Sequence, residues 1–174
     1  MSAPLPLMIV DDHPIFRKGL CEVIEGDPSL RLVGQAGNGE DALRLMEELR
    51  PAIVILDINM PKLSGLQVAR AIAERKLPIL PILLTMHEDE DLFGEAMQLG
   101  VRGYVLKESA VEELLAAIRA VMEGRTFISA SLAGLLVKRR EEASELRREK
   151  PGLDLLTPTE RKILRLVAED RTSK

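Results

Sequence analysis

Residues 53–57 read Ile-Val-Ile-Leu-Asp, four apolar residues followed directly by an acid. A short apolar run of this kind, with Pro51 just before it, is typical of a strand buried on both faces of a parallel sheet. Asp57 then stands at the carboxyl end of that strand. Open α/β sheets place their binding and reacting groups at this edge. The segment therefore predicts both a class of fold and a place for the site.

Three other apolar runs also end in polar residues that can bind a metal ion or a phosphoryl group. Residues 7–10 lead into Asp11 and Asp12, residues 79–84 into Thr85, and residues 104–106 into Lys107. Because parallel strands share one carboxyl edge, we expect these three acids, one hydroxyl and one amine to converge there.

Such a cluster has a predictable chemistry. Two carboxylates about 4 Å apart repel each other by about 4 kcal/mol at an effective dielectric constant of about 20, so the acids need a cation. Oxygen ligands alone favour a hard divalent ion, and Mg²⁺ also coordinates phosphate. Asp57 is then the natural nucleophile for forming an acyl phosphate, with Lys107 as a second positive group.

Helix-length segments separate the apolar runs. The first helix begins at Pro14, and the second begins after the capping residue Asn38. Their predicted inward-facing residues are Ile15, Phe16, Leu20, Val23 and Ile24 in the first helix, and Ala42, Leu43, Met46 and Leu49 in the second. Further helices are expected at about 65–75, 88–99 and 111–123, with a weaker strand at 30–34. The pattern predicts an α/β fold with a doubly wound, five-stranded parallel sheet.

The rest of the chain changes character. Residues 129–149 carry many charges and predict an exposed helix. Pro151 and Gly152 end it, after which Thr157, Pro158 and Glu160 form a capping box that starts another helix.

Composition limits the classes of function. Residues 1–128 carry 13 Lys and Arg against 20 Asp and Glu, net −7, whereas residues 129–174 carry 11 against 8, net +3. The acidic first part disfavours general nucleic-acid binding, and the basic remainder permits phosphate contacts. The single cysteine, Cys21, fits a reducing compartment, and no membrane-length apolar stretch or signal peptide is present. We expect a cytoplasmic protein that makes no membrane contact.

These motifs together resemble a known family. The pair Asp11-Asp12, the segment from Asp57 to Gly65, Thr85 and Lys107 resemble the receiver domain of bacterial two-component response regulators, which has a CheY-like or flavodoxin-like fold. Residues 11–14, Asp-Asp-His-Pro, and 156–164, Leu-Thr-Pro-Thr-Glu-Arg-Lys-Ile-Leu, are similar to the NarL/LuxR class. The resemblance implies a receiver domain at 1–125, a charged helical linker at 126–152 and, at 153–174, the first part of a LuxR-type helix-turn-helix domain.

The resemblance also implies roles for single residues. Asp57 would accept a phosphoryl group from a sensor histidine kinase, while Thr85 and Lys107 would contact the phosphoryl oxygens and Tyr104 would respond to activation. The Mg²⁺ ligands would be Asp11, Asp12, Asp57 and the backbone carbonyl of Asn59. Met60, Pro61 and Gly65 would shape the adjacent loop, Gly65 through its backbone freedom. Self-catalysed transfer to and hydrolysis from Asp57 would be the only chemistry, so the protein is not expected to be an enzyme.

The output is expected to be transcription. Promoter DNA would be the partner of a full-length protein, and a homodimer would suit two-fold symmetric operators. The resemblance predicts about 40 further residues, including the recognition helix, so we expect a truncated regulator that does not itself read DNA. Many receivers have a proline after the lysine, but Glu108 stands there, which leaves the geometry of the Lys107–Glu108 peptide bond open.

Two other classes of function remain open. A Mg²⁺-dependent aspartyl phosphatase would use an acid two residues after its nucleophile, whereas this chain has Asn59 there. A stand-alone receiver that acts by protein contact would use 129–174 for docking. His13 and His87 are expected in packing or surface roles, because neither has a second ligand at metal-binding spacing.

Overall fold

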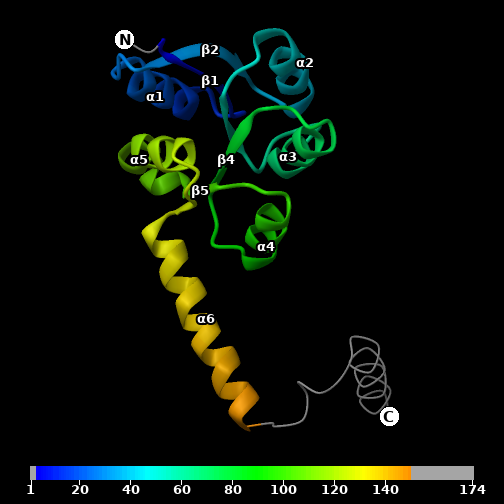
Figure 1. The fold of residues 1–174 in the computed structure, drawn as a ribbon, viewed down its shortest axis with the longest axis vertical. Coiled ribbons are helices and arrows are strands. Elements are labelled where there is room, and N and C mark those ends of the chain that lie inside the picture. The colour runs from blue at the N-terminus through cyan, green and yellow to red at the C-terminus, as the bar shows by residue number, and fades with distance from the viewer. Residues whose placement is uncertain (1–2, 150–174) are drawn as a thin grey trace. The chain divides into compact units, whose positions relative to one another are not determined.

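A computed structural model of the protein describes residues 3–149, in which strands and helices alternate along the chain (Figure 1). The strands are β1 (Leu5–Val10), β2 (Leu30–Ala36), β3 (Ile53–Asp57), β4 (Leu80–Thr85), β5 (Gly103–Leu106) and β6 (Phe127–Ile128). The helices are α1 (Pro14–Glu25), α2 (Gly39–Leu49), α3 (Gly65–Glu74), α4 (Glu90–Gln98), α5 (Ala110–Met122) and α6 (Ala130–Glu149), and a single 3-10 turn, η1 (Lys107–Ser109), precedes α5.

The strands form one sheet in the order β2-β1-β3-β4-β5-β6, and every neighbouring pair is parallel. The chain moves outward from β1 to β2, then crosses back to β3, so the sheet is doubly wound as predicted. The predicted count of five strands is wrong, because Phe127 and Ile128 pair with Gly103 and Tyr104 as a sixth strand. Two residues are too few to show an alternating pattern in the sequence.

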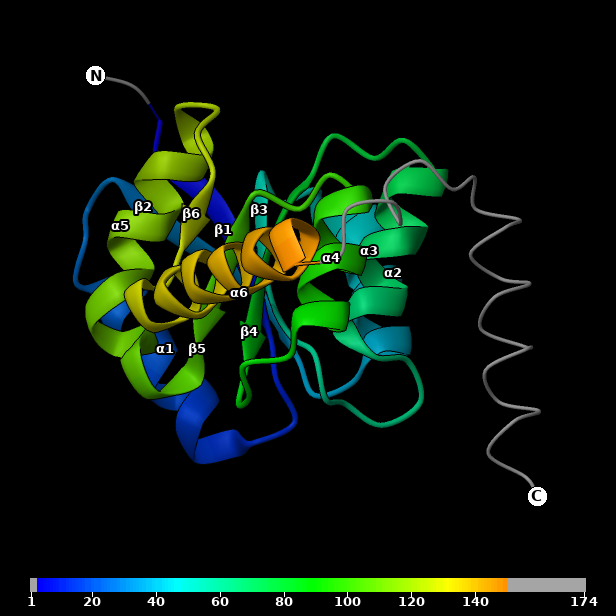
Figure 2. The ribbon, with the colours of Figure 1, turned by 90° about the horizontal axis from the view of Figure 1, so that it is seen from below.

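Helices cover both faces of the sheet (Figure 2). The helices α1 and α5 lie on one face, and α2, α3 and α4 lie on the other. Successive residues of β1 supply both layers: Leu7 and Ile9 pack with the core beneath α1 and α5, while Met8 and Val10 pack on the opposite side. All four are fully buried. This double burial is why the strands read as continuous apolar runs rather than alternating ones.

Two residues predicted to face the core do not. Ile15 is 89% exposed, because the first turn of α1 lies beyond the carboxyl edge of the sheet, where Ile15 lines a surface hollow. Leu49, in the last turn of α2, is 37% exposed and lies over Gly34 at the edge of the core. The helical spacing predicted which side of each helix faces the core, but not how far along the helix that side stays buried.

Local capping signals fix the starts of two helices. Asn38 Oδ1 accepts a hydrogen bond from the Asp41 backbone N–H at 3.0 Å, which confirms the predicted cap of α2. Ser64 and Gln67 form a reciprocal capping box at the start of α3. These side chains satisfy backbone N–H groups that a helix leaves without partners, and so hold α3 next to the loop that follows Asp57.

The residues up to Ala133 form one compact unit, and a second unit begins at Gly134. Helix α6 covers nearly all of the stretch predicted to be helical at 129–149. The capping box at Thr157, Pro158 and Glu160 lies outside the described residues. None of the described helices is both long and apolar enough to cross a membrane.

Ser129 joins β5, α5 and the start of α6. Its buried Oγ accepts a hydrogen bond from the Leu106 backbone N–H at 2.9 Å and donates one to Glu113 Oε2. Glu113 Oε2 also accepts a hydrogen bond from Ser109 Oγ at 3.0 Å. Ser129 thus extends the β5–β6 pairing through its side chain. The residue that it holds, Leu106, directly precedes Lys107.

We predict that Ser129→Ala lowers the free energy of unfolding by about 1–3 kcal/mol, because the buried Leu106 N–H loses its acceptor. Urea unfolding followed by circular dichroism measures this change. Ser131→Ala, at an exposed position two residues later, is the matched control and should have little effect. Equal stability of the Ser129 variant and the wild type would contradict the role given to this hydroxyl.

Candidate phosphoacceptor and metal site

The ends of three strands bring a buried lysine between two buried acids. Asp11 follows β1, Asp57 ends β3 and Lys107 follows β5. Lys107 Nζ lies 2.7 Å from Asp11 Oδ2 and 2.9 Å from Asp57 Oδ2, and the three side chains are at most 5% exposed. The ammonium of Lys107 also lies over an aromatic ring, with Nζ 4.9 Å from the centre of Phe16.

Asp12 and His13 complete the cluster on its open side. The Asp12 side chain is 31% exposed, and its Oδ1 lies 2.9 Å from His13 Nδ1. The same nitrogen lies 3.3 Å from Asp11 Oδ1 and 3.9 Å from Asp57 Oδ2. The sequence interpretation missed His13, which was expected in a packing or surface role. Its place directly after two acids at a strand end is the signal that could have indicated it.

The cluster has the electrostatics of a cation site. Burial raises the pKa of Asp57 above its ordinary value, and Asp11 adds to this, while Lys107 acts in the opposite direction. The buried oxygens Asp11 Oδ2 and Asp57 Oδ2 both contact the ammonium of Lys107, and the buried Asp12 Oδ1 contacts His13 Nδ1. One lysine and one imidazole face three carboxylates, so the site can hold a metal ion.

Thr85 ends β4 at the same edge of the sheet, but its hydroxyl is not part of the acid cluster. Thr85 Oγ1 donates a hydrogen bond to the His87 carbonyl at 2.9 Å and accepts one from the His87 N–H at 3.2 Å. The expected convergence of three acids and an amine is therefore present, whereas the hydroxyl is held by the backbone of the next loop.

Tyr104, on β5, is fully buried and packs against Phe93 of α4. Its ring meets that of Phe93 edge to face, with the ring centres 5.2 Å apart and the planes at 85°. Burial raises the pKa of Tyr104 to about 12. The neighbouring Thr85 side chain acts on that pKa in the opposite direction, so the Tyr104 hydroxyl lies beside Thr85.

The loop after Asp57 packs closely on the acceptor strand. The Asn59 N–H donates a hydrogen bond to Asp57 Oδ1 at 3.2 Å. The metal-binding role expected for the Asn59 carbonyl stays a prediction. The loop-shaping role expected for Met60 and Pro61 also stays a prediction. The prediction that Gly65 is needed for its backbone freedom is wrong, because the φ angle of Gly65 is not positive. A Cβ at Gly65 would instead lie 2.3 Å from the Asp57 carbonyl oxygen, so close approach of the backbone requires glycine. The Lys107–Glu108 peptide bond is trans.

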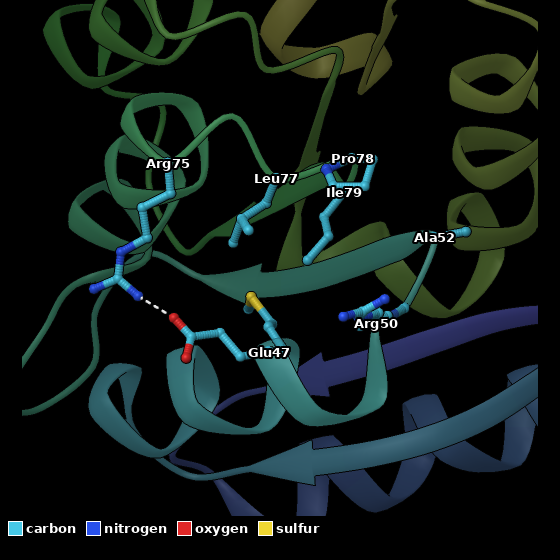
Figure 3. A pocket seen from close by; sticks show the side chains of 9 residues that line it. Glu47, Arg50, Ala52, Arg75, Leu77, Pro78 and Ile79 are labelled. Carbon is cyan, nitrogen blue, oxygen red and sulfur yellow. Dashed lines mark hydrogen bonds and ion pairs between the residues drawn. The ribbon is translucent and has the colours of Figure 1, made fainter.

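Two hollows lie at opposite edges of the sheet. One of about 460 Å³ borders the acid cluster and is lined by His13, Ile15, Phe16, Met86, Lys107 and Glu108. A larger one of about 630 Å³ lies where β3 and β4 begin, beside the last turns of α2 and α3, and an ion pair between Arg75 and Glu47 at 2.6 Å crosses it (Figure 3). The reactive groups thus occupy the carboxyl edge, and the larger hollow contains none of them.

The doubly wound parallel sheet and the cluster of acids and lysine at its carboxyl edge define a receiver fold. The chain belongs to the response regulator receiver domain family, whose pattern matches residues 7–119. This confirms the receiver part of the family resemblance. The boundaries assigned to the linker and to the helix-turn-helix segment stay predictions.

The chain is similar to several named response regulators. The nitrate/nitrite response regulator protein NarL of Escherichia coli is 32% identical over 98% of this chain and 78% of its own length. A LuxR-family two-component response regulator from Aurantimonas is 33% identical with a TM-score of 0.74, covering 79% of this chain and 99% of that one. The response regulator RcsB, solved in complex with DNA, is 26% identical with a TM-score of 0.74, covering 96% and 78% respectively.

We predict that Asp57→Asn stabilises the metal-free protein at neutral pH. Because the folded-state pKa of Asp57 is raised, ionising this carboxyl costs stability as the pH rises through that value, and Asn removes the cost. The advantage should vanish below pH 3.8, the ordinary pKa, where both the folded and unfolded states are protonated. Melting temperatures between pH 3 and pH 8 in EDTA measure this effect.

Glu22→Gln is the matched control, because it removes one exposed negative charge from the middle of α1. It should show no comparable gain at neutral pH. A melting temperature of the Asp57 variant below that of the wild type at pH 7 would show that the ion pair with Lys107 outweighs the cost of burying the carboxylate.

Proposed function

We propose that this protein is a response regulator whose Asp57 accepts a phosphoryl group from a sensor histidine kinase, with Mg²⁺ as cofactor. The observation that carries the proposal is the contact of one lysine with two buried acids, Lys107 with Asp11 and Asp57, at the carboxyl edge of a receiver sheet. Membership of the receiver family supports it.

The proposed chemistry is a direct phosphoryl transfer. A carboxylate oxygen of Asp57 attacks phosphorus while the bond between phosphorus and the kinase histidine nitrogen breaks, and the imidazole leaves with a proton from solvent. Lys107 Nζ balances negative charge on the phosphoryl oxygens, and Asp11 and Asp12 hold the cation. Bound Mg²⁺ supplies charge neutralisation and oxygen coordination at the phosphoryl group. The Asn59 carbonyl is proposed as a further ligand.

The proposed switch uses Thr85 and Tyr104. A phosphoryl group adds a charge of about −1.5 to −2 and strong acceptor oxygens, which can draw the Thr85 hydroxyl away from His87. Shifting a two-state population from 1:99 to 99:1 takes about 5.5 kcal/mol, and charge-assisted hydrogen bonds supply about 1.5–3 kcal/mol each. The buried Tyr104 hydroxyl lies beside the Thr85 side chain, so a shift of Thr85 toward the phosphoryl group would open space for a second position of that ring.

We propose transcriptional control as the output, through a LuxR-type helix-turn-helix domain that begins within 153–174. The relatives named as transcriptional or nitrate response regulators, and RcsB solved with DNA, support this output. Residues 126–152 would be the linker, the protein would act in the cytoplasm, and a homodimer would match two-fold symmetric promoter sites. No turnover of an outside substrate is proposed. Asn59, at the place of a phosphatase acid, favours this over the enzyme alternative.

The phosphoacceptor assignment is tested with acetyl phosphate and intact-mass spectrometry. In the presence of Mg²⁺ the wild type should gain one phosphoryl group, and EDTA should suppress the gain. Asp57→Asn should gain none, while the control Asp91→Asn, an exposed acid on α4, should behave like the wild type. Equal modification of the Asp57 variant would refute the assignment.

The output is tested by chromatin immunoprecipitation of the protein expressed from its own chromosomal gene. We expect enrichment at a limited set of promoters, reduced when Asp57 is replaced by Asn. Absence of promoter enrichment, with other proteins co-purifying in a manner that depends on Asp57, would favour the stand-alone receiver instead.

A further inference from the structure

His13 has an unusual place for a surface residue. Its side chain is 62% exposed, yet Nδ1 faces inward and lies within 4.0 Å of an oxygen of each of the three acids. Donor atoms of Asp11, Asp12, His13 and Asp57 all lie within 4.8 Å of one another. The ring therefore adds a nitrogen to what the sequence predicted to be an all-oxygen set.

The separations suit donors that share one ion. In an octahedral site with bonds of about 2.1 Å, neighbouring donors lie about 3.0 Å apart and opposite donors about 4.2 Å apart. His13 Nδ1 is 2.9 Å from Asp12 Oδ1 and 3.3 Å from Asp11 Oδ1, close to the spacing of neighbours. It is 3.9 Å from Asp57 Oδ2, close to the spacing of opposite donors.

The charge balance of the cluster supports a bound cation. Asp11 Oδ2 and Asp57 Oδ2 are buried and share one ammonium, that of Lys107, which leaves three carboxylates facing a single lysine. Lys107 Nζ provides one charge and also lies 3.5 Å from His13 Nδ1. When the imidazole carries its proton on Nε2, Nδ1 with its lone pair is the atom that a metal ion would bind.

We propose that His13 Nδ1 is a fourth metal ligand and that the site takes a divalent transition ion such as Mn²⁺ in preference to Mg²⁺. Mg²⁺ favours oxygen ligands, whereas transition ions also accept imidazole, and Mn²⁺ suits the three carboxylates as well. The inference rests on the metal site of the proposed function, not on phosphoryl transfer. It assigns the metal preference of this chain to the residue after Asp12.

The test measures Mn²⁺ and Mg²⁺ binding to the complete chain. Calorimetry should show tighter binding of Mn²⁺ by the wild type, and His13→Ala should weaken Mn²⁺ binding at least about tenfold while changing Mg²⁺ binding little. Pulsed electron paramagnetic resonance of bound Mn²⁺ should show coupling to a ligand nitrogen, which His13→Ala abolishes. The control His87→Ala removes the other histidine, which is exposed, and should keep the coupling.

The other outcomes are equally distinct. If His13→Ala tightens both ions alike, the imidazole competes with cations for the acids and the inference is wrong. If the wild type binds Mn²⁺ without nitrogen coupling, the inference fails while the proposed metal site stands. If the wild type binds neither ion, the cofactor of the proposed function fails as well, which the dependence of acetyl phosphate labelling on Mg²⁺ shows separately.

Discussion

The buried ion pairs of Lys107 with Asp11 and Asp57 are the constraint on which this structure depends. Two carboxylates with almost no solvent exposure repel each other, and neither is stable at the sheet edge without a nearby positive charge. The lysine supplies that charge from the end of another strand. The order of the central strands, β1 between β2 and β3, and β4 between β3 and β5, sets the span that its side chain must bridge.

The neighbouring elements keep this arrangement in register. The backbone of α3 approaches the Asp57 carbonyl so closely that only glycine fits at position 65. Ser129 holds the backbone of Leu106 just before Lys107 and connects it to Glu113 on α5. A change in charge at Asp57 therefore acts on residues fixed on several sides, and rigid packing of this kind favours discrete alternative arrangements over gradual deformation.

Much of the fold could be predicted from the sequence, because buried parallel strands read as apolar runs and Asn38 shows a helix start. The convergence of Asp11, Asp57 and Lys107 followed from the shared edge of parallel strands. The sixth strand could not be predicted, because its two residues form a strand only by pairing with the edge of β5. The outward positions of Ile15 and Leu49 were missed because a helical period does not show where the sheet beneath ends.

The sequence by itself determined the class of fold and the chemical groups at the sheet edge, because strand periodicity and the residue after each strand are local properties. Only the tertiary structure decided which of those groups touch. It turned the Thr85 hydroxyl to the His87 backbone, enclosed the Tyr104 ring against Phe93, and brought His13 Nδ1 among three carboxylates. Side-chain direction depends on neighbours from distant parts of the chain, and no spacing along one strand or helix specifies them.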